Sequence, residues 1–543
     1  MNFTRSLACS LALLPAAASA EEPLSAAASD PAETGWMQGF PPPADKVIRF
    51  SDDDAMAFPK SRWTFSHFRE LVPTHAVDRG PGAASELPER LDDGLDAVTF
   101  TPLGGGEEMT WGEAFGVNYT DGVIVLHHGA VVYERYGGAL DADGLHGAMS
   151  VTKSLAGVLA ETLIAEGELD ENAAVGDLIP ELEDSAFGDA TVRQVLDMTT
   201  ALDYSEDYAD PDAEIWQFAA AGNPLPKPDD YDGPRSFYGF LQTVEKDGEH
   251  GEVFSYDTPN AELVGWLIAR TTGESAADLL SERVWSRIGA EREGFFTVDS
   301  IGTPSTGGGF NGNLRDMARF GQLMLDGGRV GGEQVIPVAA IESIRTGGDP
   351  EKFAPSGHDT LPGWSYKSLW WVSHNDHGAY AARGVYGQTV WVDPTADVVI
   401  ARFGSHPVAA NAANDPTSLP AYHAVAEHLM QNDPAPLLGR AWSIGSVGGE
   451  EVVEGSEPEL TFGRDGRLSG TTGCNRFFGE WEADEGELSV SNLGSTRMAC
   501  PPELMDQEKR VLDLLAAVER FEVREDGSLV LTSSDNGSLT ATR

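Results

Sequence analysis

The stretch "GAMSVTKSLAG", residues 147–157, places a serine three positions before a lysine at the point where an apolar run begins. Apolar residues then recur at helical spacing, so the stretch predicts a helix that starts near Ser150. Ser150 and Lys153 would lie on one face of that helix and could meet. Two interpretations remain open: a nucleophilic serine with its lysine base, or an exposed serine beside a lysine that only covers apolar surface.

A functional pair would depend on its surroundings. The amide groups at a helix start favour a developing serine oxyanion. A lysine that loses its hydration between two lobes has a lowered pKa and becomes useful as a base. The rest of the chain would have to supply a third proton-handling group, an oxyanion hole and a pocket.

The segment "FSYDTPNAELVGWLIARTTG", residues 254–273, offers the proton-handling group. Pro259 suits the first turn of a helix, with Thr258 or Asp257 as its cap. Tyr256 would then lie on the turn before the helix, where its hydroxyl can relay a proton to the leaving group. The alternative is a core tyrosine with a satisfied hydroxyl.

The segment "ARGVYGQTVWVDP", residues 382–394, offers the oxyanion hole. Gly384 and Gly387 at a strand edge would let a substrate approach the backbone closely. The amide of Val385 could pair with the amide of Ser150 to bind an oxyanion.

Strand patterns at 122–138 and 385–404 flank a helix-rich middle. They predict an α/β (α+β) domain over 37–432, with an antiparallel sheet flanked by helices, a helical lobe and an active site between the two. Residues 433–439, "DPAPLLG", read as a linker. Short strands with Gly and Asp turns and one helix predict a separate, small β-rich domain over 440–543.

The N-terminus predicts export. Residues 1–20 combine Arg5, an apolar stretch and the small-residue ending "ASA", which is the pattern of a signal peptide and too short for a membrane span. Residues 21–36 are rich in Ala, Glu, Ser and Pro and read as a disordered leader. We expect a periplasmic or secreted protein without a membrane span.

The composition limits the classes of molecule that the protein is expected to bind. The formal charge of −51 disfavours nucleic acid. His127 and His128 are adjacent, and on a strand they would point to opposite faces, so we expect no metal site. No cofactor is expected, and the partner would be a small-molecule ester or amide.

The motifs together, in this order, resemble the serine β-lactamase and penicillin-recognising superfamily. "MSVTKS", "VLDMTTALDYSEDYADPDAEI", "FSYDTPNAELVGWL", "RDMARFGQLMLDGG" and "GVYGQTVWVDP" are similar to the nylon-oligomer (aminohexanoate-dimer) hydrolases and their carboxylesterase relatives, over roughly 37–430. This resemblance implies a class C β-lactamase-like fold. It also implies a role for each of these residues: Ser150 as acyl-enzyme nucleophile, Lys153 as base, Tyr256 as proton relay, Val385 as oxyanion donor, Tyr208 on a loop that closes over substrate, and Trp371 as a pocket wall.

Three positions depart from the family patterns. Ala382 stands where the superfamily usually has a lysine or histidine, and Thr258 replaces the asparagine of the Tyr-x-Asn motif. Both changes remove groups that bind a β-lactam. Ala219 stands in the region where the nylon-oligomer branch has an acidic residue for the substrate's amino group. We therefore expect ester hydrolysis more than hydrolysis of nylon oligomers.

The C-terminal segments "TTGCNRFFGEW" and "STRMACPP" resemble the META/HslJ-type domain. Cys474 and Cys500 lie in these motifs, and in an exported protein we expect them to form a disulfide. Two buried free thiols are the alternative.

The sequence thus predicts an exported serine hydrolase that opens a carboxylic ester or linear amide through an acyl-enzyme. A β-lactamase or D-Ala-D-Ala peptidase is an alternative of the same class. A non-catalytic envelope binding protein that retained the fold is an alternative of another class. The oligomeric state is left open.

Overall fold

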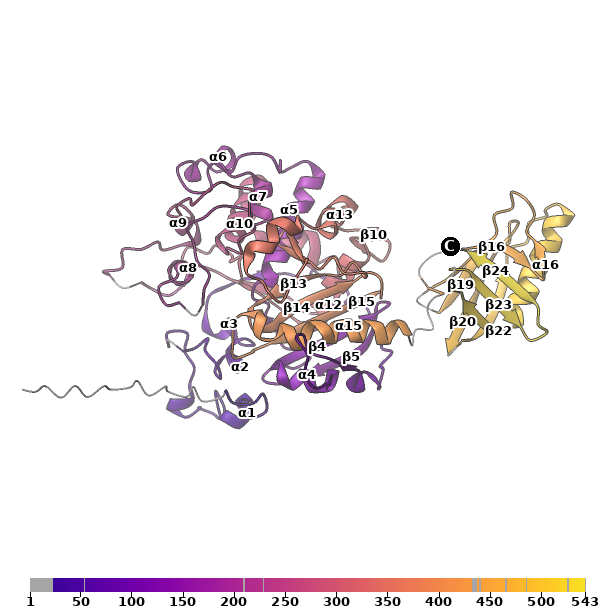
Figure 1. Ribbon diagram of the computed structural model, residues 1–543, viewed down its shortest axis with the longest axis horizontal. Helices are drawn as coiled ribbons and strands as arrows, with labels where there is room; N and C mark the ends of the chain where they lie inside the picture. The colour runs from indigo at the N-terminus through magenta and orange to yellow at the C-terminus, as the bar shows by residue number, and fades with distance from the viewer. Residues whose placement is uncertain are drawn as a thin grey trace, which may run out of the picture.

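The computed structural model describes residues 23–52, 54–208, 210–227, 229–431, 437–438, 441–463, 466–484, 486–524 and 527–542 (Figure 1). The predicted signal peptide, residues 1–20, lies outside the described residues, as does most of the predicted linker at 433–439.

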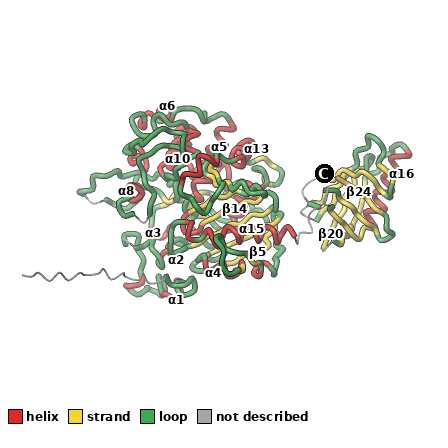
Figure 2. The backbone as a smooth tube through the Cα atoms, viewed as in Figure 1, coloured by secondary structure: helices red, strands yellow, loops and turns green. Residues whose placement is uncertain are grey.

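A seven-stranded antiparallel sheet forms the centre of the larger domain (Figures 1 and 2). Its strands, in spatial order, are β11 (Ser365–Lys367), β12 (Trp370–Val372), β13 (Tyr380–Gly384), β14 (Gln388–Asp393), β15 (Val398–Gly404), β4 (Thr120–His127) and β5 (Ala130–Tyr136). The pairing of β15 with β4 joins the late strands to the early ones, as predicted. His128 and Gly129 turn the β4–β5 hairpin with positive φ angles of 52° and 74°, which a two-residue turn of this type requires.

Shorter strands complete the domain. A four-stranded sheet has the order β1 (Thr74–Val77), β7 (Gly294–Thr297), β8 (Phe310–Gly312) and β6 (His146–Gly147). Two further pairs are β2 (Thr99–Phe100) with β3 (Met109–Thr110), and β9 (Arg329–Val330) with β10 (Glu333–Gln334).

Helix α5 (Val151–Glu166) contacts both the sheet and the helical lobe. Its residues from Val151 to Leu163 are all buried, because the helix is apolar around most of its circumference. It ends at Gly167, which adopts the left-handed conformation (φ 77°) of a helix C-cap. Helix α12 (Leu314–Leu325) packs on β14 and β15.

The other helices of this domain are short, apart from α10 and α15. They are α1 (Pro31–Thr34), α2 (Ser61–Thr64), α3 (Phe68–Leu71), α4 (Trp111–Val117), α6 (Val175–Leu178), α7 (Val192–Leu196), α8 (Glu214–Gly222), α9 (Phe237–Leu241), α10 (Pro259–Thr272), α11 (Ala276–Leu280), α13 (Val338–Thr346), α14 (Pro350–Phe353) and α15 (Asp415–Gln431). Helices α7, α9 and α10 pack against one another or α5 and form the predicted helical lobe. Within the described ranges, no helix has both the length and the apolar character that a membrane crossing needs.

The segment expected to be a disordered leader, residues 21–36, is folded from Pro23 onward, so the prediction of disorder is wrong for residues 23–36. The carbonyl of Leu24 accepts a hydrogen bond of 2.8 Å from the Tyr119 hydroxyl. Ser29 is fully buried, and Pro31–Thr34 form a helix that the Asp30 side chain caps. Composition suggested disorder, but contacts with residues far along the chain order the segment.

The C-terminal domain is a nine-stranded antiparallel sheet that closes through an additional pairing of β16 with β24. Its strands are β16 (Trp442–Val447), β17 (Glu450–Glu451), β18 (Glu459–Phe462), β19 (Arg467–Thr471), β20 (Arg476–Asp484), β21 (Glu487–Ser495), β22 (Val518–Val523), β23 (Leu529–Ser533) and β24 (Ser538–Thr542), with helix α16 (Pro502–Ala516) inserted before β22. Closure removes exposed strand edges. The domain has its own apolar core, centred on Trp442, Phe462 and Leu515.

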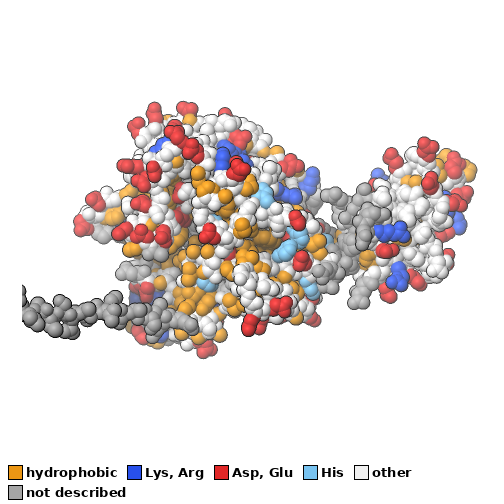
Figure 3. Space-filling view, viewed as in Figure 1, with side chains coloured by type: hydrophobic (Ala, Val, Ile, Leu, Met, Phe, Trp, Pro, Cys, Tyr) orange, Lys and Arg blue, Asp and Glu red, His pale blue; other side chains and the backbone are white. Residues whose placement is uncertain are grey.

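The acidic composition is visible on the surface. Figure 3 shows acidic side chains scattered over the face in view, with fewer basic ones between them. A surface of this sign repels phosphate backbones.

Cys474 and Cys500 form a disulfide in the structure, with a sequence separation of 26. Loop-closure arithmetic for such a separation gives a stabilisation of about 3–4 kcal/mol. Because both cysteines belong to the C-terminal domain, reduction should destabilise that domain and leave the larger one unchanged. Intact-mass analysis after alkylation under denaturing, non-reducing conditions checks the bond, and calorimetry with and without reductant checks its effect. Uptake of two alkyl groups without reductant would contradict the prediction.

Candidate active site

Ser150 and Lys153 meet at the start of α5. Ser150 occupies the N-cap position, and Lys153 lies in the first turn. The Lys153 Nζ atom is 2.9 Å from Ser150 Oγ. Ser150 retains 7% exposure, whereas Lys153 retains 1%. The nucleophile candidate is therefore within reach of a small molecule, while its partner is shielded from bulk water.

Burial lowers the pKa of Lys153 to about 8, against the opposing influence of the carboxylates of Glu206 and Glu262, which raise it. A low-dielectric environment disfavours the charged ammonium form. A large fraction of Lys153 is therefore neutral near pH 8, and a neutral amine next to a serine hydroxyl can accept its proton.

A carboxylate on α10 positions the lysine indirectly. Lys153 Nζ donates to the carbonyl of Gly307 at 2.7 Å. Glu262 accepts hydrogen bonds from the amides of Thr306 and Gly307 and from the Ser305 hydroxyl, at 2.7–3.0 Å. Burial raises the pKa of Glu262 to about 7, partly offset by these donors. Glu262 thus fixes the 305–307 turn whose carbonyl holds Lys153.

Tyr256 completes the group. The Ser150 side chain lowers the pKa of its hydroxyl against the larger, opposite effect of burial, and Lys153 Nζ lies 5.1 Å from the centre of its ring. Burial, followed by the nearby Glu206 carboxylate, raises the pKa of Tyr256 far above its usual value. The phenol therefore remains protonated at neutral pH and can donate a hydrogen bond to a leaving group.

An aromatic wall lies behind Tyr256. Trp371, on β12, stacks on the Tyr256 ring at a centroid distance of 5.4 Å and an interplanar angle of 28°. Tyr366 and Phe254 pack edge-on against Trp371. Trp371 thus borders the site where the family resemblance placed it, and the two further rings are residues that the sequence analysis missed.

Glu206 connects the loop before α8 to the start of α10. Its carboxylate accepts hydrogen bonds from the Thr258 amide (2.7 Å), the Thr258 hydroxyl (2.7 Å) and the Tyr208 hydroxyl (2.8 Å). Thr258 occupies the N-cap position of α10, as one of the two residues expected there, but its side chain makes no capping hydrogen bond within the helix. The acidic side chain two residues before Tyr208 could have drawn attention to Glu206, but its partner lies 52 residues away.

The end of β13 runs directly past Ser150. A methyl group at Gly384 would lie 2.8 Å from both the Ser150 nitrogen and the Ala148 oxygen, so only glycine fits there. Val385, the next residue, opens the 385–387 turn, in which Tyr386 has a φ of 64°. The side chain of Gln388 donates to the Val385 carbonyl at 3.2 Å and holds the turn. This geometry places the backbone of Val385 near the nucleophile.

A buried arginine explains the glycine at position 387. A methyl group at Gly387 would lie 2.1 Å from Nη2 of Arg402. The glycine makes room for a buried arginine, and the expected approach of substrate at this position stays a prediction.

Strand β13 has no cationic side chain at position 382, but it has one at position 383. Ala382 is fully buried. Arg383 is only 5% exposed, forms an ion pair with Asp415, and lies with its guanidinium 5.3 Å from the Trp371 ring. Because Arg383 is paired, it does not replace a free cation at position 382.

Comparison with known proteins identifies the family of each part of the chain. Residues 116–419 match the family model "Beta-lactamase", and residues 435–543 match the model "META domain". The 6-aminohexanoate-dimer hydrolase of Paenarthrobacter ureafaciens is 35% identical over 351 residues, which cover 64% of this chain and 86% of that protein. A solved structure named "Putative 6-aminohexanoate-dimer hydrolase from Bacillus anthracis" is 31% identical, with a TM-score of 0.65, and covers 72% of this chain and 99% of its own.

The heat shock protein HslJ of Escherichia coli (strain K12) is 34% identical over 84 residues, which cover 15% of this chain and 59% of HslJ. These matches confirm the two-part organisation of the chain and its mixed α/β fold. The chain belongs to the beta-lactamase family, as a hydrolase similar to 6-aminohexanoate-dimer hydrolases that carries a C-terminal META domain.

Proposed function

We propose that the protein hydrolyses a carboxylic ester or a linear amide through an acyl-enzyme on Ser150. The observation that carries the proposal is the buried Lys153 amine, 2.9 Å from Ser150 Oγ and with a pKa lowered to about 8. A lysine that only covers apolar surface would keep its amine in water. Here the amine is buried against a serine hydroxyl, where a base is useful.

Neutral Lys153 would take the Ser150 proton while Oγ attacks the substrate carbonyl. The amides of Ser150 and Val385 would bind the developing oxyanion. Tyr256, whose pKa is raised by burial, would relay a proton to the leaving oxygen or nitrogen. Water would then attack the acyl-enzyme and release the carboxylic acid, and the same groups would transfer protons in the opposite direction.

The site favours simple esters over β-lactams. No cationic side chain occupies position 382, and Arg383 is already paired with Asp415. A β-lactam carboxylate would therefore lack a partner. The aminohexanoate dimer is a second candidate because of the relative at 35% identity. Ala219 lies exposed on α8 and offers no carboxylate for a substrate amino group.

Export is part of the proposal. The apolar N-terminal pattern of residues 1–20 and the disulfide between Cys474 and Cys500 both suit an oxidising compartment outside the cytoplasm. Detection of the mature protein, with residues 1–20 removed, in a periplasmic or culture-medium fraction would support it.

Replacing the nucleophile should abolish activity without unfolding the protein. Ser150→Ala should reduce turnover of a short-chain nitrophenyl ester to below about a hundredth and remove fluorophosphonate labelling, with Tm nearly unchanged. Ser154→Ala is the matched control on the same helix, because the Ser154 hydroxyl donates to the Leu369 carbonyl. A Ser150→Ala enzyme that kept more than about a hundredth of wild-type turnover would end the proposal.

The pH dependence of kcat/KM should report the protonation of the Lys153 amine. Because the neutral amine is the base, kcat/KM should rise with pH through an apparent pKa near 8. Glu206→Gln should move this acidic limb to lower pH, because the Glu206 carboxylate raises the pKa of Lys153.

Asp207→Asn is the control for that shift, since it removes the same charge from the adjacent, exposed side chain. Solvent screening should make its effect much smaller. Equal shifts in the two variants, or an acidic limb unchanged in Glu206→Gln, would contradict the assignment of the limb to Lys153.

A substrate panel should separate the candidate activities. Acetyl and butyryl nitrophenyl esters should be turned over at least about a hundredfold faster, in kcat/KM, than a chromogenic cephalosporin, which lacks a cationic partner in the site. The aminohexanoate dimer forms the third arm. Efficient cephalosporin turnover, absent in Ser150→Ala, would replace the esterase assignment with a β-lactamase one.

A further inference from the structure

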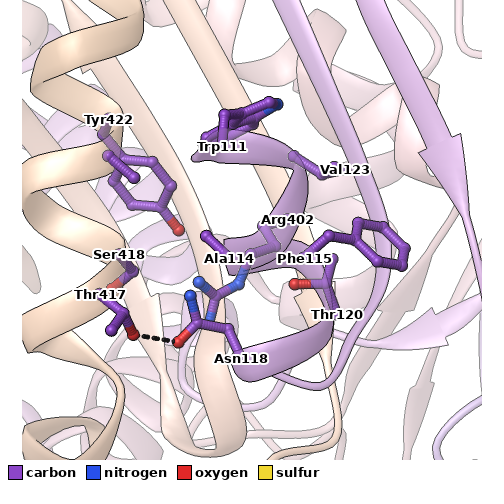
Figure 4. Close-up of a pocket in the computed structure, with 11 residues that line it drawn as sticks. Trp111, Ala114, Phe115, Asn118, Thr120, Val123, Arg402, Thr417, Ser418 and Tyr422 are labelled. Carbon is purple, nitrogen blue, oxygen red and sulfur yellow. Dashed lines mark hydrogen bonds between the residues drawn. The ribbon is translucent and has the colours of Figure 1, made fainter. Parts of the chain in front are cut away.

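A small cavity lies away from Ser150, between α4, α15 and the strands β4 and β15 (Figure 4). Its volume is about 10 Å³, which is room for one water molecule or one monoatomic ion. Its lining residues are Trp111, Ala114, Phe115, Asn118, Thr120, Val123, Arg402, Thr417, Ser418, Ala421 and Tyr422. None of these residues has a carboxylate.

Arg402 brings a positive charge into this cavity without a counter-ion. Its side chain is only 4% exposed. Nε donates to the Gly387 carbonyl at 2.9 Å, and Nη2 donates to the Asn414 side-chain oxygen at 3.2 Å. Among the described residues, these two bonds, from Nε and Nη2, are the hydrogen bonds that the guanidinium makes, and it forms no ion pair with a carboxylate. A buried charge without a partner is strongly unfavourable.

Two neutral donors face the same space. The Tyr422 hydroxyl is buried and has no hydrogen-bond partner among the described residues, although its side chain is only 1% exposed. Asn118 accepts a hydrogen bond of 2.6 Å from Thr417 on its side-chain oxygen, which leaves its amide group to donate. Figure 4 shows Arg402, Tyr422 and Asn118 grouped around the cavity.

We propose that this cavity is a binding site for one halide ion, which in ordinary buffers is chloride. The guanidinium, the hydroxyl and the amide can all donate hydrogen bonds, and one anion can accept all three. A water molecule has two lone pairs and would leave one donor unsatisfied while the charge stayed uncompensated. Thr417 and Ser418 lie in the first turn of α15, where the helix dipole favours an anion, and the acidic side chain of that turn, Asp415, is already paired with Arg383.

The ion would act on the fold through Arg402. The guanidinium holds the Gly387 carbonyl, and Gly387 ends the turn that begins at Val385. Neutralising Arg402 should therefore stabilise the junction of β14 and β15 beside that turn. The proposal does not depend on the chemistry assigned to Ser150, so the two can fail separately.

Bromide is the direct probe. Crystals of the full-length protein grown or soaked in sodium bromide should show an anomalous peak within hydrogen-bonding distance of Arg402 and Tyr422. In solution, the Tm in sodium chloride should exceed the Tm in sodium gluconate at equal ionic strength, because gluconate is too large for the cavity. At ten times the Kd, one bound ion should raise Tm by about 2 °C in a domain of this size.

Tyr422→Phe removes one donor and keeps the ring, so it should weaken the chloride effect on Tm. Tyr380→Phe is the matched control: it also removes a buried hydroxyl, one that donates to the Met324 carbonyl, and should leave the chloride effect unchanged. If Tyr422→Phe does not fold, the bromide measurement on the wild type decides. No bromide peak at Arg402, or equal Tm values in chloride and gluconate, would overturn the proposal.

Discussion

The burial of one amine next to one hydroxyl is the constraint on which the candidate site depends. Lys153 sits under a sheet and a helical lobe with 1% exposure, and an amine that deep in a protein tends to lose its proton. Helix α5 carries both groups and must approach the sheet closely to bury them. Gly157 permits this approach, because a methyl group there would lie 2.1 Å from the Ser368 carbonyl oxygen. The fold thus supplies the low dielectric that changes an ordinary lysine into a base.

Two buried or half-buried carboxylates then connect separate segments around that lysine. Glu262 holds the turn at 305–307, and Glu206 holds the loop that carries Tyr208 against Thr258. Both carboxylates also raise the pKa of Lys153, which counteracts part of the effect of burial. The same two side chains therefore set the geometry of the site and tune the proton affinity of its base. This coupling explains why a substitution at Glu206 is best examined through a pH profile.

The turn after β13 shows how a buried arginine can position the backbone next to a site without being part of that site. Gly384 is a glycine because Ser150 lies against it, and Gly387 is a glycine because Arg402 lies against it. The two glycines look equivalent in sequence, but one faces the nucleophile and the other faces a charged group in the scaffold. If a halide neutralises Arg402, the ionic composition of the medium changes the stability of this turn. The C-terminal domain, with its own core and its own disulfide, has no part in these contacts.

Local pattern determined a large part of this structure. Strand patterns around short turns predicted the β4–β5 and β14–β15 hairpins, and apolar residues at helical spacing predicted α5, because these elements depend on neighbours close in sequence. The order of motifs around Ser150, Tyr256 and Gly384 indicated the family. Only the tertiary structure decided the roles of Glu206, Glu262 and Arg402 and the folding of residues 23–36. Glu206 holds Thr258 across 52 positions, and Lys153 and Gly307 are separated by 154 positions. Sequence spacing carries no information about such contacts, because the fold creates them.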